Sequence, residues 1–277
     1  MVSNFQPIGV FDSGYGGLTI LKDFLNDLPG YDFIYLGDNA RAPYGSRSFE
    51  VVYEYTLQAV KKLFEMGCPL VILACNTASA KALRNIQQND LPKMDPGKRV
   101  LGVIRPAVES IGEFTKNGHV GILGTVGTVL SNSYPIELEK WSGGKVVQTT
   151  QEACPIWVPL VENNEIDNPG TEYFVSANIR KLLAADPEID AIILGCTHYP
   201  LLMPVIWKYV PEGIQLLEQG KVVSRKLVEY LDRHPEMDKR CSKSGQVKYY
   251  TTENVEVFEK NAATFIGHQI KSEKLVL

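Results

Sequence analysis

The sequence predicts an α/β fold of two similar lobes, each a mostly parallel sheet flanked by helices, with the active site in the cleft between them. Two observations lead to this prediction. Short apolar runs alternate with longer segments of helical period, the pattern of parallel strands joined by crossover helices. The order strand, glycine turn, helices and strand ending in cysteine also occurs twice, as IGVFDSG with VILACNTAS and as VGILGTVG with AIILGCTHY.

Eight apolar runs are predicted strands: 8–11, 33–37, 70–74, 100–103, 120–123, 145–149, 191–194 and 214–217. Eight segments have helical spacing: 16–27, 46–66, 77–88, 135–141, 172–184, 199–209, 221–234 and 255–267. In the longest, Val52, Ala59 and Leu63 belong to one apolar stripe. No Ser/Gly linker marks a boundary, so the repeat sets the expected lobes at residues 1–98 plus 208–277 and at residues 99–207.

Composition excludes several classes of protein. The 277 residues include 28 Lys+Arg and 32 Asp+Glu, a net charge of −4 without a basic stripe, which argues against nucleic-acid binding. No apolar run is long enough to span a bilayer and no signal peptide precedes the first strand, so a cytoplasmic protein without a membrane partner is expected. Five cysteines, an odd number, make disulfides unexpected in that compartment.

Cys75 and Cys196 each follow a predicted central strand, in matching places of the two lobes. A single strand-end cysteine is most often a small buried packing residue. Here both are followed by polar residues rather than by more core, which favours a function. Open parallel sheets bind ligands at this end of their strands, where helix starts expose N–H groups.

A helix start also favours a thiolate, so both thiols are expected to exchange protons near neutral pH. If the lobes face each other, the two sulfurs approach one ligand from opposite sides. This arrangement suits removal of a proton from one face of a carbon atom and delivery of a proton to the other.

Three further turns are candidates for holding the ligand. Asp12, at the end of the first strand, either caps a helix or offers its carboxylate to an amine or to a thiol. The N–H groups of Tyr44 and Gly45 could bind a carboxylate, although a packing turn explains them equally well. His198 could tune Cys196 or polarise a substrate carboxylate.

The motifs for metals and cofactors are absent from the sequence. The spacing of Cys196 and His198 is poor for zinc, and there is no CxxC. The glycines at 14–17 match neither the dinucleotide nor the P-loop motif, and no lysine ends a strand as a Schiff-base residue would. The chemistry is therefore expected to need no cofactor and no metal.

The remaining cysteines and histidines have simpler interpretations. Cys68 and Cys154 are expected to pack in the core, and Cys241, among Lys, Arg and Ser, to be an exposed thiol without a role. The other histidines are expected at the solvated surface: His119, His234 and His268.

Five blocks resemble the bacterial glutamate racemases, in family order over about residues 8–202. They are FDSGYGGL at 11–18, GDNARAPYG at 37–45, ACNTAS at 74–79, ACP at 153–155 with VPLVE at 158–162, and GCTHYPLL at 195–202. The resemblance implies cofactor-free interconversion of L- and D-glutamate for peptidoglycan synthesis, by a homodimer. The chain departs from the common family pattern at Asn39, Arg105 and Gln219.

The resemblance also implies a role for each site residue. Cys75 corresponds to the base that deprotonates D-glutamate, and Cys196 to the base for L-glutamate. Asp12 and His198 correspond to groups that assist the thiols, and Glu162 to a further acidic site residue. The implied substrate contacts are Asp12, Ser13, Tyr44, Gly45, Asn76, Thr77, Thr197 and His198.

Other functions remain open. Aspartate or hydantoin racemisation could use the same scaffold, although the intact blocks around the cysteines favour glutamate. A two-lobed amino-acid binding protein would have no use for paired thiols. A Cys-His hydrolase would leave the second cysteine unexplained.

Overall fold

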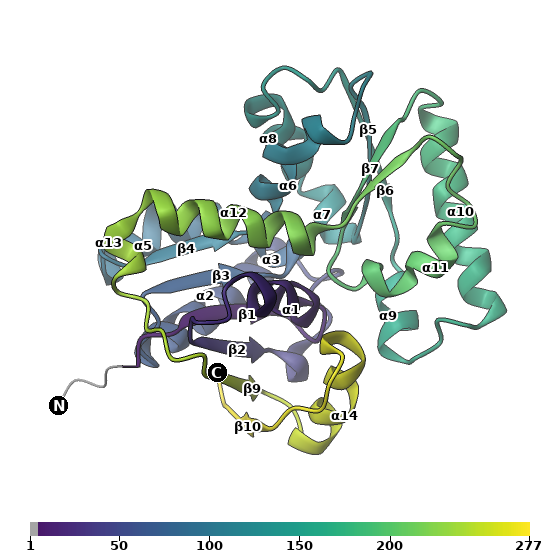
Figure 1. Cartoon of the computed structure of the whole chain (residues 1–277). Helices are drawn as coiled ribbons and strands as arrows, with labels where there is room; N and C mark the ends of the chain where they lie inside the picture. The colour runs from purple at the N-terminus through teal and green to yellow at the C-terminus, as the bar shows by residue number, and fades with distance from the viewer. Residues whose placement is uncertain (1–4) are drawn as a thin grey trace.

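The computed structural model describes residues 5–277 and arranges them in two lobes (Figure 1). Within these residues, a six-stranded sheet has the order β10-β9-β2-β1-β3-β4 and a four-stranded sheet the order β6-β5-β7-β8. All the strand pairings in both sheets are parallel. The predicted α/β fold of two lobes is confirmed.

The strands of the first sheet are β1 (Ile8–Asp12), β2 (Phe33–Gly37), β3 (Leu70–Leu73), β4 (Arg99–Gly102), β9 (Val247–Thr251) and β10 (Ser272–Lys274). Those of the second are β5 (His119–Gly124), β6 (Gln148–Ala153), β7 (Ala191–Gly195) and β8 (Gln215–Leu217). The central strands β1, β3 and β7 are buried along their whole length, because helices cover both faces of each sheet. This burial explains their continuous apolar sequences.

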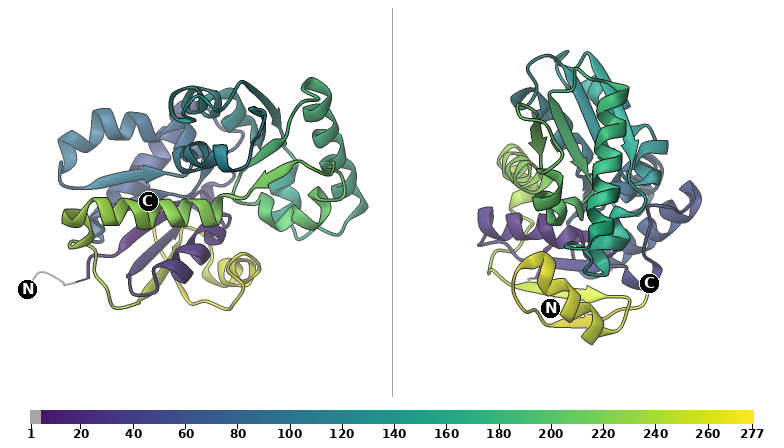
Figure 2. Two further views of the ribbon diagram at one scale, coloured as in Figure 1. Left: turned by 45° about the horizontal axis from the view of Figure 1, so that its top comes forward. Right: turned by 90° about the vertical axis from the view of Figure 1, so that its right-hand side faces the viewer.

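The helices around the first sheet are α1 (Gly17–Asp27), α2 (Phe49–Glu65), α3 (Asn76–Lys81), α4 (Leu83–Asn85), α5 (Leu91–Met94), α12 (Gln219–Arg233), α13 (Pro235–Asp238) and α14 (Val255–Ile266). Those of the second lobe are α6 (Ile104–Ser110), α7 (Val126–Leu130), α8 (Ser133–Trp141), α9 (Trp157–Glu162), α10 (Pro169–Ala185) and α11 (Met203–Ile206). Helix α12 packs against α1 of the first lobe and α6 of the second, and so holds the lobes together (Figures 1 and 2).

Local sequence accounts for where the long helices begin and end. Ser48 and Asn254 cap α2 and α14 by accepting a hydrogen bond from the N–H three residues later. Gly267 ends α14 in the left-handed conformation, at a φ of 92°. In α10, Asn168 is the cap and Pro169 occupies the first turn, where its missing N–H costs no hydrogen bond.

The structure differs from the predicted elements in several places. Strands β9 and β10 were not predicted, because their sequences VKYYT and SEK are not apolar runs. Strand β6 begins at Gln148 rather than 145, after a turn in which Gly143 and Gly144 have positive φ. The predicted helix 77–88 is broken into α3, α4 and a π turn at Ile86–Asp90, and helix 199–209 becomes a 3₁₀ turn followed by α11.

The expected return of the chain to the first lobe, at residue 208, falls before strand β8. Strand β8 pairs with β7 and belongs to the four-stranded sheet. After β8, the chain next contacts the first lobe at α12, which packs against α1. We therefore propose that the second lobe extends through β8 to Leu217.

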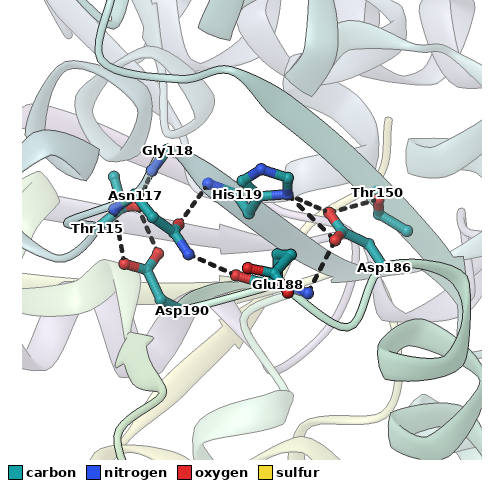
Figure 3. Close-up of polar contacts among 8 residues, drawn as sticks. All are labelled: Thr115, Asn117, Gly118, His119, Thr150, Asp186, Glu188 and Asp190. Carbon is teal, nitrogen blue, oxygen red and sulfur yellow. Dashed lines mark hydrogen bonds and ion pairs between the residues drawn. The ribbon is translucent and has the colours of Figure 1, made fainter.

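A polar cluster fastens the second sheet at its amino end, opposite the carboxyl ends of the strands (Figure 3). Nδ1 of His119 lies 3.0 Å from the Asp186 carboxylate, which also accepts a hydrogen bond from Thr150. Asp190 accepts hydrogen bonds from the backbone N–H groups of Lys116 and Asn117. The expectation of a solvated His119 is therefore wrong.

Two other expectations about isolated side chains are also corrected. Cys241 is buried, with only 4% of its surface exposed, because the loop after α13 folds back onto the amino ends of β1 and β2. The ring of His234 stacks on Tyr230 rather than extending into solvent. Cys68 and Cys154 are buried as predicted, and His268 is exposed as predicted.

Candidate active site

The carboxyl ends of the two sheets face each other across a cavity of about 170 Å³. Ten of the eleven expected site residues line it, all except Asp12: Ser13, Tyr44, Gly45, Cys75, Asn76, Thr77, Glu162, Cys196, Thr197 and His198. None of the described residues lining the cavity is Lys or Arg. Its small volume suits a small metabolite better than a nucleotide cofactor.

Cys75 lies between the end of β3 and the start of α3, where it is the helix cap. Its sulfur accepts a hydrogen bond from the Ala78 N–H at 3.4 Å and lies 3.4 Å from the Ser13 hydroxyl. Burial raises the pKa of the thiol to about 12, and the nearby Asp12 carboxyl adds to the rise. In the empty cavity Cys75 is therefore a neutral thiol.

For Cys75, this result corrects the expectation that a helix start lets the thiol exchange protons near neutral pH. At Cys75, the two hydrogen bonds that favour the anion are outweighed by the loss of water around a buried sulfur. Cys196 does not cap an α-helix at all, since only a 3₁₀ turn at Tyr199–Leu202 follows it.

Cys196 belongs to a row of three groups with His198 and Glu162. Nδ1 of His198 lies 3.8 Å from the Cys196 sulfur, and Nε2 lies 2.9 Å from the Glu162 carboxylate. Burial disfavours a charged imidazole, but the hydrogen bonds to Cys196 and Glu162 outweigh it and raise the pKa of His198 to about 10. His198 is therefore an imidazolium, and its Nδ1 faces the Cys196 sulfur.

Replacing Glu162 by glutamine should lower the pKa of His198, because the amide offers no negative charge to the imidazolium. NMR titration of the His198 ring measures the change. In the parent protein the ring should stay protonated up to pH about 10. Its contribution to stability is then complete below roughly pH 6.5 and is lost as the pH rises toward 10.

The matched control is Glu165→Gln. The exposed Glu165 carboxylate lies just after α9 and accepts a hydrogen bond from the Asn168 side chain. This variant should leave the His198 titration where it is. An unchanged midpoint in the Glu162→Gln protein would show that the carboxylate does not hold the imidazolium.

Asp12 ends β1 but does not line the cavity. One carboxylate oxygen accepts the Gly14 N–H at 2.9 Å, while the other, Oδ1, is buried without a hydrogen-bond partner. Burial raises the pKa of this carboxyl, against the opposing charge of His198. Asp12 is thus buried outside the cavity lining, directly before Ser13 in the chain.

The loop before α2 is held by a buried carboxylate. Asp38 accepts hydrogen bonds from the Tyr44 hydroxyl and, at 2.7 Å, from Arg41. The side chain of Tyr44 is therefore occupied, and this loop offers the cavity its backbone at Tyr44 and Gly45. Lys81 also holds the loop, by donating to the Arg47 carbonyl at 2.6 Å.

The two lobes approach closely on both sides of the cavity, and glycines make this possible. A Cβ atom on Gly16 would lie 2.2 Å from Thr197 Oγ1 and 2.5 Å from His198 Nδ1. On the other side, the Gly45 carbonyl accepts the Gly127 N–H at 2.7 Å. The glycines of both turns are therefore required by close packing between the lobes.

Several cavity residues were missed by the sequence reasoning. They are Pro43, Ser46, Thr125, Val126, Cys154, Pro155, Val158 and Pro159. Thr125 could have been found, because it follows β5 in the repeat just as Ser13 follows β1. Its hydroxyl lies 2.9 Å from that of Thr77 and so joins the lobes. Cys154, Pro155, Val158 and Pro159 lie in the family blocks at 153–155 and 158–162, but were not expected to line the site.

Within residues 5–277, no group of three or more His, Cys, Asp or Glu side chains is arranged to hold a metal ion. No helix in the same part of the chain is long and apolar enough to cross a membrane.

Comparisons with known proteins identify the family of the chain. The family model for Asp/Glu/hydantoin racemase matches residues 25–227. A glutamate racemase from Ruegeria sp. is 40% identical, over 97% of this chain and 99% of its own. One from Listeria monocytogenes is 35% identical, over 95% and 94%.

Solved structures give the same result. A glutamate racemase isoform from Bacillus anthracis matches with a TM-score of 0.88 and 32% identity, covering 98% of each chain. The enzyme from Francisella tularensis in complex with D-glutamate has a TM-score of 0.83 and 29% identity, covering 99% of this chain and 98% of its own. Because the family model matches more than half of the sequence and the relatives match nearly all of it, the chain belongs to the Asp/Glu/hydantoin racemase family.

Proposed function

We propose that the protein is a cofactor-independent glutamate racemase, which interconverts L- and D-glutamate with two opposed cysteines and supplies D-glutamate for peptidoglycan synthesis. The observation that carries this proposal is one small cavity with Cys75 on the wall from the first lobe and Cys196 on the wall from the second. A hydrolase or a binding protein would need neither the second thiol nor this symmetry.

The two sulfurs have different surroundings: Cys196 faces the His198 imidazolium, whereas Cys75 is buried beside Ser13 and Asp12. The Cys196 thiolate, stabilised by the His198 imidazolium, removes the Cα proton of L-glutamate and becomes a thiol. The electron pair of the broken bond delocalises into the α-carboxylate. The neutral Cys75 thiol then gives its proton to the opposite face of Cα, which yields D-glutamate and leaves Cys75 as a thiolate.

The reverse reaction uses the same groups in exchanged roles. Cys75, as the thiolate, removes the proton from D-glutamate, and Cys196 delivers one. Because burial raises the pKa of Cys75 to about 12, a thiolate there needs a positive partner, and the substrate ammonium is one. We assign Asp12 to assist Cys75, and Glu162 to hold His198 in its charged form.

The substrate is anionic although the described lining has no Lys or Arg. We therefore expect both carboxylates to be held by backbone N–H groups and hydroxyls at Ser13, Tyr44–Gly45, Asn76–Thr77 and Thr197. A crystal structure of the glutamate complex tests this expectation. Salt bridges from Lys or Arg to both carboxylates would refute it.

The activity itself is tested with protein dialysed against a chelator and treated with hydroxylamine. Incubated with L-glutamate, it should form D-glutamate in a chiral assay at the rate of untreated protein. Activity lost on treatment and restored by zinc or pyridoxal phosphate would contradict the cofactor-free mechanism. Turnover of L-aspartate but not of L-glutamate would favour the alternative substrate.

The relatives favour glutamate over aspartate. The glutamate racemases match at TM-scores up to 0.88, whereas an aspartate racemase from Picrophilus torridus, at 17% identity and a TM-score of 0.52, is similar in fold alone. We further propose a cytoplasmic location, where the five free cysteines stay reduced, and a homodimer. Analytical ultracentrifugation tests the dimer.

A further inference from the structure

Three buried side chains form a closed ring of hydrogen bonds beside the cavity. The Tyr134 hydroxyl donates to Asn76 Oδ1 at 2.7 Å, and Gln219 Nε2 donates to the Tyr134 oxygen at 2.8 Å. Asn76 Nδ2 closes the ring by donating to Gln219 Oε1 at 2.5 Å. Each of the three is at most 2% exposed, so none exchanges these partners for water.

The orientation of the ring is fixed by a neighbour outside it. Gln219 Nε2 also donates to the Val103 carbonyl at 3.1 Å, which excludes the flipped amide, because its oxygen would then face another oxygen. Burial raises the pKa of Tyr134, so its hydroxyl stays protonated and donates to Asn76. One N–H group and the oxygen of the Asn76 side-chain amide are thereby engaged in the ring.

The ring touches the chain beside each of the two cavity thiols. Asn76 directly follows Cys75 and is the first residue of α3. On the other side, the Tyr134 ring packs against Gly195, the residue before Cys196, so closely that a Cβ there would lie 3.1 Å from Tyr134 Cε2. One tyrosine therefore contacts the backbone next to Cys196 and, through its hydroxyl, the residue next to Cys75.

The same ring lies where the chain crosses between the lobes. Val103 precedes α6, where the chain enters the second lobe, and Gln219 begins α12, where it returns. Tyr134 belongs to α8 of the second lobe and Asn76 to α3 of the first. A change in the ring would therefore shift one lobe relative to the other.

We propose that Tyr134 and Gln219 are positioning residues that set the separation of Cys75 and Cys196 across the substrate. The inference rests on the proposed two-thiol racemase and goes beyond it. Racemisation requires both sulfurs to reach opposite faces of one Cα, so it depends on their separation. Removal of a proton by one sulfur alone does not.

The test compares these two reactions in the Tyr134→Phe protein. Chloride elimination from threo-3-chloroglutamate needs one thiolate, which takes the Cα proton while the electron pair forms the Cα–Cβ double bond and chloride leaves. Racemisation kcat should fall about 10- to 100-fold, the usual cost of a displacement near 1 Å. Elimination from either enantiomer should fall by less than about threefold, and KM for glutamate should stay within about threefold.

A second variant and a control complete the experiment. Gln219→Leu should lower the ratio of racemisation to elimination in the same way, and the double variant should be no worse than either single one, because each opens the same ring. The control is Tyr53→Phe, which also removes a tyrosine hydrogen bond, the one that the partly buried Tyr53 donates to Asp90 at 2.6 Å. Tyr53 does not line the cavity, so this variant should keep the parental rates of racemisation and elimination.

The outcomes separate the two proposals. If the parent protein racemises glutamate and both folded variants keep the parental ratio of racemisation to elimination, the positioning role is wrong, whether or not their stability has changed. If the parent protein eliminates chloride but does not racemise glutamate, the proposed function itself fails.

Discussion

Cys75→Ser and Cys196→Ser should each lower racemisation by about 10²- to 10⁴-fold, because each removes the acid or base for one face of Cα. A serine hydroxyl is far harder to ionise than a thiol, so it cannot replace the thiolate at neutral pH. The cavity itself is unchanged by the exchange of sulfur for oxygen, and glutamate binding should persist. Chiral analysis of the product measures the loss.

Each single variant should still eliminate chloride from one enantiomer of threo-3-chloroglutamate. The Cys196→Ser protein retains Cys75 and should use the D-like analogue, whereas the Cys75→Ser protein should use the L-like analogue. Cys241→Ala is the matched control, since this buried thiol lies at the opposite end of the first sheet and should be dispensable. The same enantiomer preference in both serine variants would contradict the opposed arrangement.

Gly16→Ala should also abolish most of the activity, although it adds a single methyl group. The new Cβ would lie 2.2 Å from Thr197 Oγ1 and 2.5 Å from His198 Nδ1, so the two lobes must separate or His198 must turn away from Cys196. Either movement displaces a catalytic group, and we expect a loss of about 10²-fold in kcat/KM. Steady-state kinetics measure it.

Gly30→Ala is the control for this substitution. No atom lies within 4 Å of a Cβ placed there, and its φ is not positive, so full activity is expected. Parental activity in the Gly16→Ala protein would show that the close approach of α1 to the loop after β7 does not matter for catalysis.

Much of this architecture can be predicted from the sequence. Buried parallel strands such as β1, β3 and β7 are continuous apolar runs, and the polar residues that follow them mark the cavity. Strands β9 and β10 could not be found in this way. Strand β9 adds to the edge of β2, in the register Phe33↔Val247, and β10 then adds to β9, although neither sequence is an apolar run.

The charges in the site also could not be predicted. Both cysteines follow a strand, but burial keeps Cys75 neutral, and contacts with Cys196 and Glu162 keep His198 charged. Contacts between the lobes have no local signal either. Gln219 belongs to a polar turn in the sequence, yet its amide meets Tyr134 and Asn76, residues 85 and 143 positions away.

The central claim is that one thiol removes a proton from Cα and the other delivers a different proton to the opposite face. Incubation of the protein with L-glutamate in D2O tests it directly, with mass spectrometry of each separated enantiomer at low conversion. The account predicts D-glutamate that carries deuterium at Cα, while the remaining L-glutamate stays unlabelled. D-glutamate that retains the original proton, or L-glutamate that gains deuterium as fast as product forms, would contradict two separate thiols and point to a single base.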